Sequence, residues 1–105
     1  VCAGKDARDM IVACRRLSQI GGGYVIAEGG RVVDELPLPA YGLMSLGGAE
    51  ETAAAIARTA ESAHALGVGR GIDPFTTLSF VALPVIPRLR LLDTGLYDTE
   101  TRSFL

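Results

Sequence analysis

Apolar positions near the start of the chain repeat with the period of an α-helix. Four of them recur at i, i+3, i+4 and i+7, namely Met10, Ala13, Cys14 and Leu17. Asp6 precedes this stretch and is of the residue type that caps a helix N-terminus, whereas Gly21 suits the left-handed residue that ends a helix. The pattern predicts a helix between them with one buried stripe, in which Cys14 is an inert core thiol.

A second period follows, in which short β-prone runs alternate with glycines. The run from Tyr24 to Ala27 is apolar on both faces, and Gly29-Gly30 separates it from a second run, Arg31 to Leu36. This spacing predicts a hairpin whose first strand is covered above and below. Pro37 and Pro39 cannot donate to a β-ladder, so the chain up to Gly42 should be extended, either at a sheet edge or as a linker. Residues 1–3 are interpreted as the end of a further strand.

The stretch from Ala49 to Leu66 is rich in alanine and predicts the longest helix. One face carries small and apolar residues: Ala53, Ile56, Ala60 and Ala63. The other face carries polar residues: Glu51, Arg58, Glu61 and Ser62. Arg58 and Glu61 are spaced for an ion pair within the helix, and such a pair adds at most a few tenths of a kcal/mol.

The C-terminal third predicts one short helix followed by strands. Asp73-Pro74 is a favourable N-cap and first-turn combination, so we expect a helix over Phe75 to Leu83, although several of its residues also suit a strand. Three strand segments follow: Arg88 to Leu92, Leu96 to Asp98 and Ser103 to Leu105. We predict an α+β fold, with a mixed or antiparallel sheet of about four or five strands and two main helices packed on it.

Composition limits the classes of partner. The 105 residues are expected to form one domain over residues 1–105. The hydrophobic content of 49% is high for so small a unit, and only 21% of the residues are charged. Part of the apolar surface is therefore expected to meet another domain or a second copy, as in a homo-oligomer. A net charge of -2 with interspersed signs gives no basic patch for nucleic acid or for an anionic membrane.

The two cysteines, Cys2 and Cys14, lack the spacing of a zinc site, and no segment resembles a signal peptide. These features indicate a cytoplasmic protein. Leu78 to Ile86 is the most apolar run, but it is too short to span a bilayer and contains Pro84.

Few side chains could carry chemistry. His64 is the only histidine and a catalytic metal normally needs three or more protein ligands, so we interpret it as a packed or interface residue. Arg70, within a glycine-rich loop, could bind an anion, although a flexible loop is the favoured interpretation. Asp73 is explained by capping, and Thr76 and Thr77 beside it would act only through a site completed elsewhere. We therefore predict no catalytic and no metal-binding residue; the low-priority candidates for an interface or pocket are His64, Arg70, Asp73, Thr76 and Thr77.

Two turn carboxylates, Asp93 and Asp98, flank the glycine of Asp93-Thr94-Gly95. We expect both to be solvated, because polar side chains in turns normally face water.

Two long stretches, IGGGYVIAEGGRVVDELPLPAYGLMS at 20–45 and DPFTTLSFVALPVIPRLRLLDTGLYD at 73–98, resemble the C-terminal domain of bacterial adenine deaminases, in the amidohydrolase superfamily. The resemblance runs from about Gly4, through Asp9-Met10, to the end of the chain. It implies a parent enzyme that converts adenine and water to hypoxanthine and ammonia. In that enzyme a barrel domain, N-terminal to this chain, would hold a divalent metal: manganese, iron or zinc. The family's C-terminal domain would also begin upstream of Val1.

This resemblance makes an accessory domain, itself not catalytic, the first hypothesis, with the barrel domain as its partner. Two alternatives stay open. The chain could be a free-standing module that binds a small ligand beneath the segment Gly67 to Thr77, or a domain whose role is homo-oligomerisation.

Overall fold

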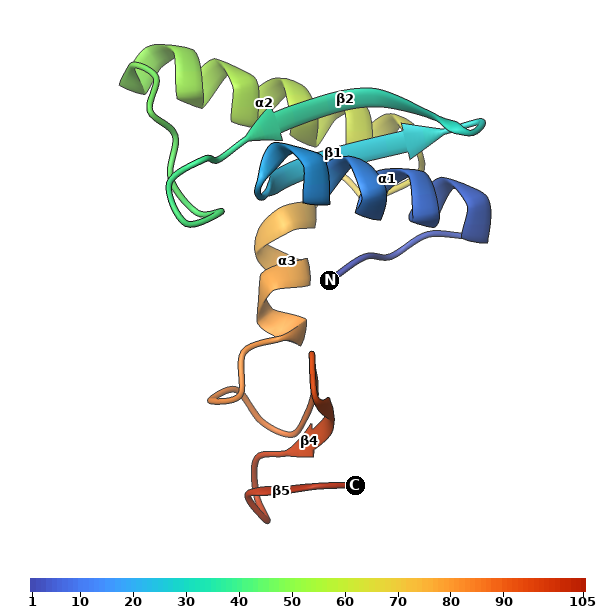
Figure 1. The fold of residues 1–105 in the computed structure, drawn as a ribbon, viewed down its shortest axis with the longest axis vertical. Coiled ribbons are helices and arrows are strands. Elements are labelled where there is room, and N and C mark those ends of the chain that lie inside the picture. Colours follow the sequence, from blue (N-terminus) through green and yellow to red (C-terminus); the bar gives the residue numbers. More distant parts are fainter. The chain divides into compact units, whose positions relative to one another are not determined.

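The computed structural model describes residues 1–105. Its contacts divide the chain into two compact units, one of residues 2–72 and one of residues 73–105 to which Val1 is also assigned. Five strands form two antiparallel sheets, and three helices accompany them (Figure 1). The predicted α+β class is confirmed. The single domain over residues 1–105 stays a prediction.

The first unit is a hairpin between two helices. Helix α1 (Ala7–Ile20) precedes strands β1 (Gly23–Glu28) and β2 (Arg31–Pro37), and helix α2 (Ala49–Ala65) follows them. Both helices contact both strands, and Figure 1 shows the hairpin lying between them. The first strand is thus covered on both faces, as its apolar pattern predicts.

Local signals set the bounds of α1 as expected. The carboxylate of Asp6 accepts hydrogen bonds from the backbone N–H groups of Arg8 and Asp9, and Gly21 ends the helix with a φ of 78°. The predicted strand end at residues 1–3 is wrong, because these residues have no regular secondary structure.

The hairpin pairs Tyr24 with Leu36 and Glu28 with Arg31, with a bulge between Ile26 and Ala27. The bulge places one extra residue in β2, which locally increases the twist of the ladder. The chain turns back at Ala40–Met44, which pair as an isolated bridge, so the expected extended segment ends earlier than Gly42.

The core of this unit lies along the hairpin. Four apolar residues are buried: Ile26, Leu36, Leu38 and Ala63. The predicted apolar face of α2 is wrong in part, because Ala53 and Ile56 are exposed while Thr59 is fully buried. The Thr59 hydroxyl donates to the carbonyl groups of its own helix, which removes the cost of burying it. Cys14 is exposed, so its predicted place in the core is also wrong.

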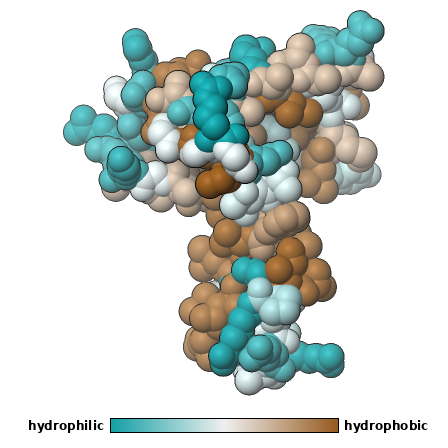
Figure 2. Space-filling model, turned by 180° about the vertical axis from the view of Figure 1, so that it is seen from behind, coloured by the Kyte–Doolittle hydropathy of each residue, from teal (hydrophilic) through white to brown (hydrophobic).

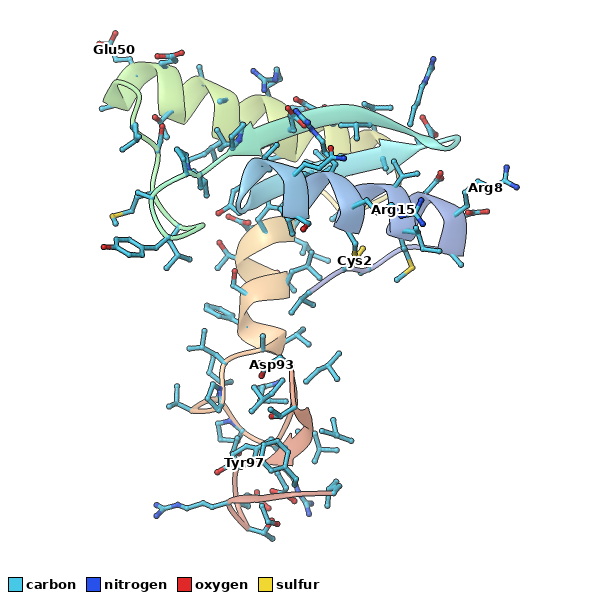
Figure 3. The ribbon with its side chains drawn as sticks, in the orientation of Figure 1. Cys2, Arg8, Arg15, Glu50, Asp93 and Tyr97 are labelled. Carbon is cyan, nitrogen blue, oxygen red and sulfur yellow. The ribbon has the colours of Figure 1, made fainter.

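The second unit consists of helix α3 (Pro74–Val81) and a three-stranded meander of β3 (Leu89–Leu92), β4 (Gly95–Asp98) and β5 (Ser103–Phe104). Tyr97, labelled in Figure 3, pairs with Phe104 across β4 and β5, with ring centroids 5.1 Å apart in an edge-on arrangement. The five strands therefore belong to two sheets rather than one. Prolines cause part of this division, since they interrupt the chain after β2 and again between α3 and β3.

Asp98 closes the turn after β4 instead of facing water. Its side chain is 4% exposed and accepts hydrogen bonds from the N–H groups of Glu100 and Thr101 and from Arg88. The Glu100 N–H is the main reason that the pKa of Asp98 lies below its usual value. The prediction of a solvated carboxylate is wrong for Asp98 and confirmed for Asp93, which is exposed.

We predict that the glycines between α1 and β1 tolerate alanine very unequally. A Cβ on Gly23 would lie 2.1 Å from the Leu36 carbonyl oxygen, whereas one on Gly21 meets nothing within 4 Å. Gly21→Ala should therefore cost about 1 to 2 kcal/mol for its left-handed backbone alone. Gly23→Ala should lower the free energy of unfolding by more than about 3 kcal/mol, measured by urea denaturation. Equal midpoints for the two variants would contradict this close approach.

Candidate functional site

The five residues singled out from the sequence are divided between the two units. His64 and Arg70 belong to the first unit, whereas Asp73, Thr76 and Thr77 belong to the second. Each is held by local contacts that account for its position.

His64 closes the C-terminal end of α2. It is half-buried, and its Nδ1 lies 3.1 Å from the Val68 carbonyl oxygen. Because a carbonyl only accepts, Nδ1 carries the proton in this hydrogen bond. The Val68 N–H in turn donates to the carbonyl of Ala63, so the ring and the backbone together satisfy groups at the helix end.

Arg70, in the glycine-rich loop, forms an ion pair with Glu61. Its Nη1 lies 2.8 Å from both carboxylate oxygens of Glu61. Glu61 is therefore paired with Arg70, and the ion pair expected between Arg58 and Glu61 within α2 does not form. Both partners are exposed, at 75% and 62% of the side chain, so the pair contributes little to stability.

Asp73 caps α3 as predicted. Its carboxylate accepts from the N–H groups of Phe75 and Thr76 at 3.1 and 2.9 Å, and its carbonyl accepts from the N–H of Thr77. Thr76 and Thr77 are exposed in the first turn of this helix.

Sequence reasoning missed the main polar cluster, which is centred on adjacent residues of β2. Neighbouring side chains of a strand point to opposite faces, and here Glu35 binds α1 while Asp34 binds α2. Glu35 accepts two hydrogen bonds from Arg16, at 2.6 and 2.7 Å. Asp34 accepts from Arg58 at 3.0 Å and from Ser62 at 2.8 Å. A pair of adjacent carboxylates between the apolar residues of a strand is the signal that could have revealed it.

Both carboxyl groups have lowered pKa values. The hydrogen bonds from Arg16 are the main cause for Glu35. For Asp34, burial acts in the opposite direction, but the hydrogen bonds from Arg58, Ser62 and the Glu35 N–H outweigh it and keep the pKa below its usual value. The cluster therefore holds two ionised carboxylates, each paired with a guanidinium group.

A third carboxylate joins α1 to the hairpin turn. Asp9 accepts hydrogen bonds from the N–H groups of Gly29 and Gly30, at 3.1 and 2.6 Å. Glycines in this turn have positive φ angles, 62° and 79°, which present both N–H groups to the helix. The Asp9-Met10 pair of the sequence motif thus contributes a structural contact.

The two thiols are neighbours. Figure 3 shows Cys2 beside α1, and its thiol interacts with that of Cys14. Burial raises the pKa of the Cys2 thiol, and the Cys14 thiol raises it further. No three His, Cys, Asp or Glu side chains of the chain come together in a way that could hold a metal ion. The divalent metal that the sequence resemblance implies would belong to the barrel domain, and these side chains would not hold it.

Comparison with known proteins identifies the family. The family model described as "Adenine deaminase C-terminal domain" matches residues 1–103. The chain belongs to the adenine deaminase C-terminal domain family. No solved structure matches it.

Curated members of this family are long proteins. A protein of Nitratidesulfovibrio vulgaris strain Hildenborough named adenine deaminase is 50% identical over 105 residues, which cover 99% of this chain and 18% of that protein. Adenine deaminase 2 of Carboxydothermus hydrogenoformans is 43% identical, with 98% and 18% covered. An adenine deaminase of Cereibacter sphaeroides strain KD131 is 44% identical, with 97% and 18% covered. The chain thus spans about a fifth of the length of the curated relatives that it matches.

None of the three helices has both the length and the apolar content of a membrane span.

We predict that His64→Ala loosens the end of α2. The variant loses the Nδ1 hydrogen bond to Val68, which should lower the free energy of unfolding by about 1 kcal/mol. His64→Asn keeps a side-chain N–H donor and should recover part of that loss. Urea denaturation of both variants measures the effect, and an unchanged midpoint in His64→Ala would show that the ring does not support the helix end.

The β2 cluster predicts acid sensitivity. A carboxyl group whose folded-state pKa is lowered stabilises the fold above its unfolded pKa, and this stabilisation is lost as the pH falls through the folded pKa. The free energy of unfolding should thus be nearly constant above about pH 5 and fall below about pH 4. Asp34→Asn/Glu35→Gln should be less stable at neutral pH and should show a shallower decline in acid. Parallel profiles for the variant and the parent chain would count against the cluster.

Proposed function

We propose that this chain is the C-terminal accessory part of an adenine deaminase, an enzyme that hydrolyses adenine to hypoxanthine and ammonia in purine salvage. The observation that carries the proposal is the 50% identity over 99% of the chain to a protein named adenine deaminase. The reaction takes place in a barrel domain of the full-length enzyme. A divalent metal held there, manganese, iron or zinc, would activate the attacking water.

The residues of this chain support an accessory role over a catalytic one. His64 donates to a backbone carbonyl, and Arg70 is paired with Glu61. The carboxylates of the β2 cluster are each engaged by a guanidinium group that joins strand to helix. The interactions of these polar groups therefore stabilise the fold.

Exposed apolar surface supports a role in contacting other parts of the enzyme. The four buried core residues all lie in the first unit, whereas the second buries only Pro74 and Asp98. In the second unit, Figure 2 shows apolar surface over α3 and the segment after it, and large exposed residues there include Phe80, Val85, Leu91 and Phe104. Surface of this kind marks an interface. We propose that the barrel domain covers part of it and that the enzyme is a cytoplasmic homo-oligomer.

This proposal is favoured over a free-standing ligand-binding module, because the relatives carry the same segment within chains of about five times its length. Homo-oligomerisation is compatible with the accessory role and is part of the proposal.

The test compares ammonia release from adenine by two purified proteins: residues 1–105 alone and the full-length protein that contains them. Both are supplied in turn with Mn²⁺, Fe²⁺ and Zn²⁺, and circular dichroism verifies that the shorter protein is folded. We expect turnover by the full-length protein only. Turnover by residues 1–105 would overturn the accessory role, and its absence from the metal-loaded full-length protein would overturn the assignment to adenine.

A further inference from the structure

The connection between β2 and α2 presents an unusually apolar surface. Figure 1 shows it extending from the end of the hairpin opposite to the Gly29-Gly30 turn. The large apolar residues of the segment 41–46, called here the apolar loop, are exposed by 91%, 78%, 56% and 80%: Tyr41, Leu43, Met44 and Leu46. No charged residue occurs between Glu35 and Glu50.

The apolar loop has a defined backbone conformation, held by hydrogen bonds and a close backbone contact. Ala40 and Met44 form an isolated bridge, with hydrogen bonds of 3.2 and 3.1 Å in the two directions. Gly42 lies against Gly22, where an added Cβ would come within 2.5 Å of the Gly42 Cα, so only glycine at position 22 allows this approach. Tyr41 has a φ of 59°, in the left-handed region that is costly for a residue with a side chain.

The residue that anchors the chain just before the apolar loop is buried. Leu38 is 6% exposed, and its N–H donates to the Gly22 carbonyl at 3.1 Å. Backbone contacts therefore hold the loop in a conformation that costs free energy at Tyr41 and leaves four large apolar side chains in water. An apolar surface that covers these side chains removes the second cost, and the free energy of that burial offsets the first.

We propose that the apolar loop is a docking element that inserts against the barrel domain of the same polypeptide. This inference rests on the proposed function. The relatives place about four fifths of their length outside the matched segment, which supplies a partner of sufficient size on every copy of the chain. The absence of charge from residues 36–49 suits a desolvated contact between protein domains and gives no attraction to anionic lipid or nucleic acid.

Photo-crosslinking in the full-length enzyme tests the docking element. Tyr41 is replaced by p-benzoylphenylalanine, which keeps an aromatic ring at the most exposed position of the loop. The same replacement at Leu43, 78% exposed, provides a second probe should the first protein fail to fold. Arg31 at the opposite end of the hairpin is exposed and serves as the control position. Mixing ¹⁴N- and ¹⁵N-labelled enzyme separates crosslinks within one chain from crosslinks between copies.

We expect the probes at Tyr41 and Leu43 to crosslink to residues of the barrel domain within the same copy, and the probe at Arg31 not to do so. Adding Leu46→Asp to the Tyr41 probe should reduce the crosslink to the level of the Arg31 control. Crosslinks only to the part of the C-terminal domain upstream of Val1, only to residues 73–105, only to a second copy, or to no protein at all would overturn the docking element. Ammonia release by the same preparations separates the two proposals, since an active enzyme without the crosslink to the barrel domain retains the proposed function and loses only the loop's role.

Discussion

The first unit depends on the alternation of side chains along β2. Asp34 and Glu35 are neighbours, so they point to opposite faces of the hairpin, and each binds an arginine of a different helix. A two-stranded sheet is marginal by itself, because it has few ladder bonds and little apolar area. Here the hairpin is stabilised by helices on both faces, and the two carboxylates set where each helix lies along the strand. Burial of apolar side chains drives the packing of the helices on the hairpin, and the ion pairs fix the position of each helix along the strand.

A second constraint is the close approach of backbone segments, which only glycines permit. The chain passes from α1 into β1 with so little room that side chains at Gly22 or Gly23 would overlap the backbone of Gly42 or Leu36. This close approach brings the β2–α2 connection against the end of α1. The same three-glycine run therefore ends a helix, starts a strand and supports the apolar loop.

The two units differ in how much they depend on neighbours. The first has a small buried core, whereas the second buries a carboxylate, Asp98, and leaves most of its large apolar side chains exposed. Under the proposed function another part of the enzyme would cover this surface, which agrees with a chain that makes up about a fifth of its relatives' length. Within such an enzyme the segment would contribute contacts, and the chemistry would belong to the barrel domain.

Much of the local structure follows from the sequence alone, because caps, glycine turns and prolines act over a few residues. Asp6, Gly21 and Asp73 set helix ends in this way, and the motifs were sufficient to indicate the family. Only the tertiary structure decides which side chains are buried, since burial depends on partners distant in the sequence. Helical spacing placed Cys14 in the core, and turn chemistry placed Asp98 in water. The first assignment failed because neighbouring elements, rather than the helix itself, determine which helix face is covered. The second failed because Asp98 accepts hydrogen bonds from the N–H groups of its own turn and from Arg88 instead of from water.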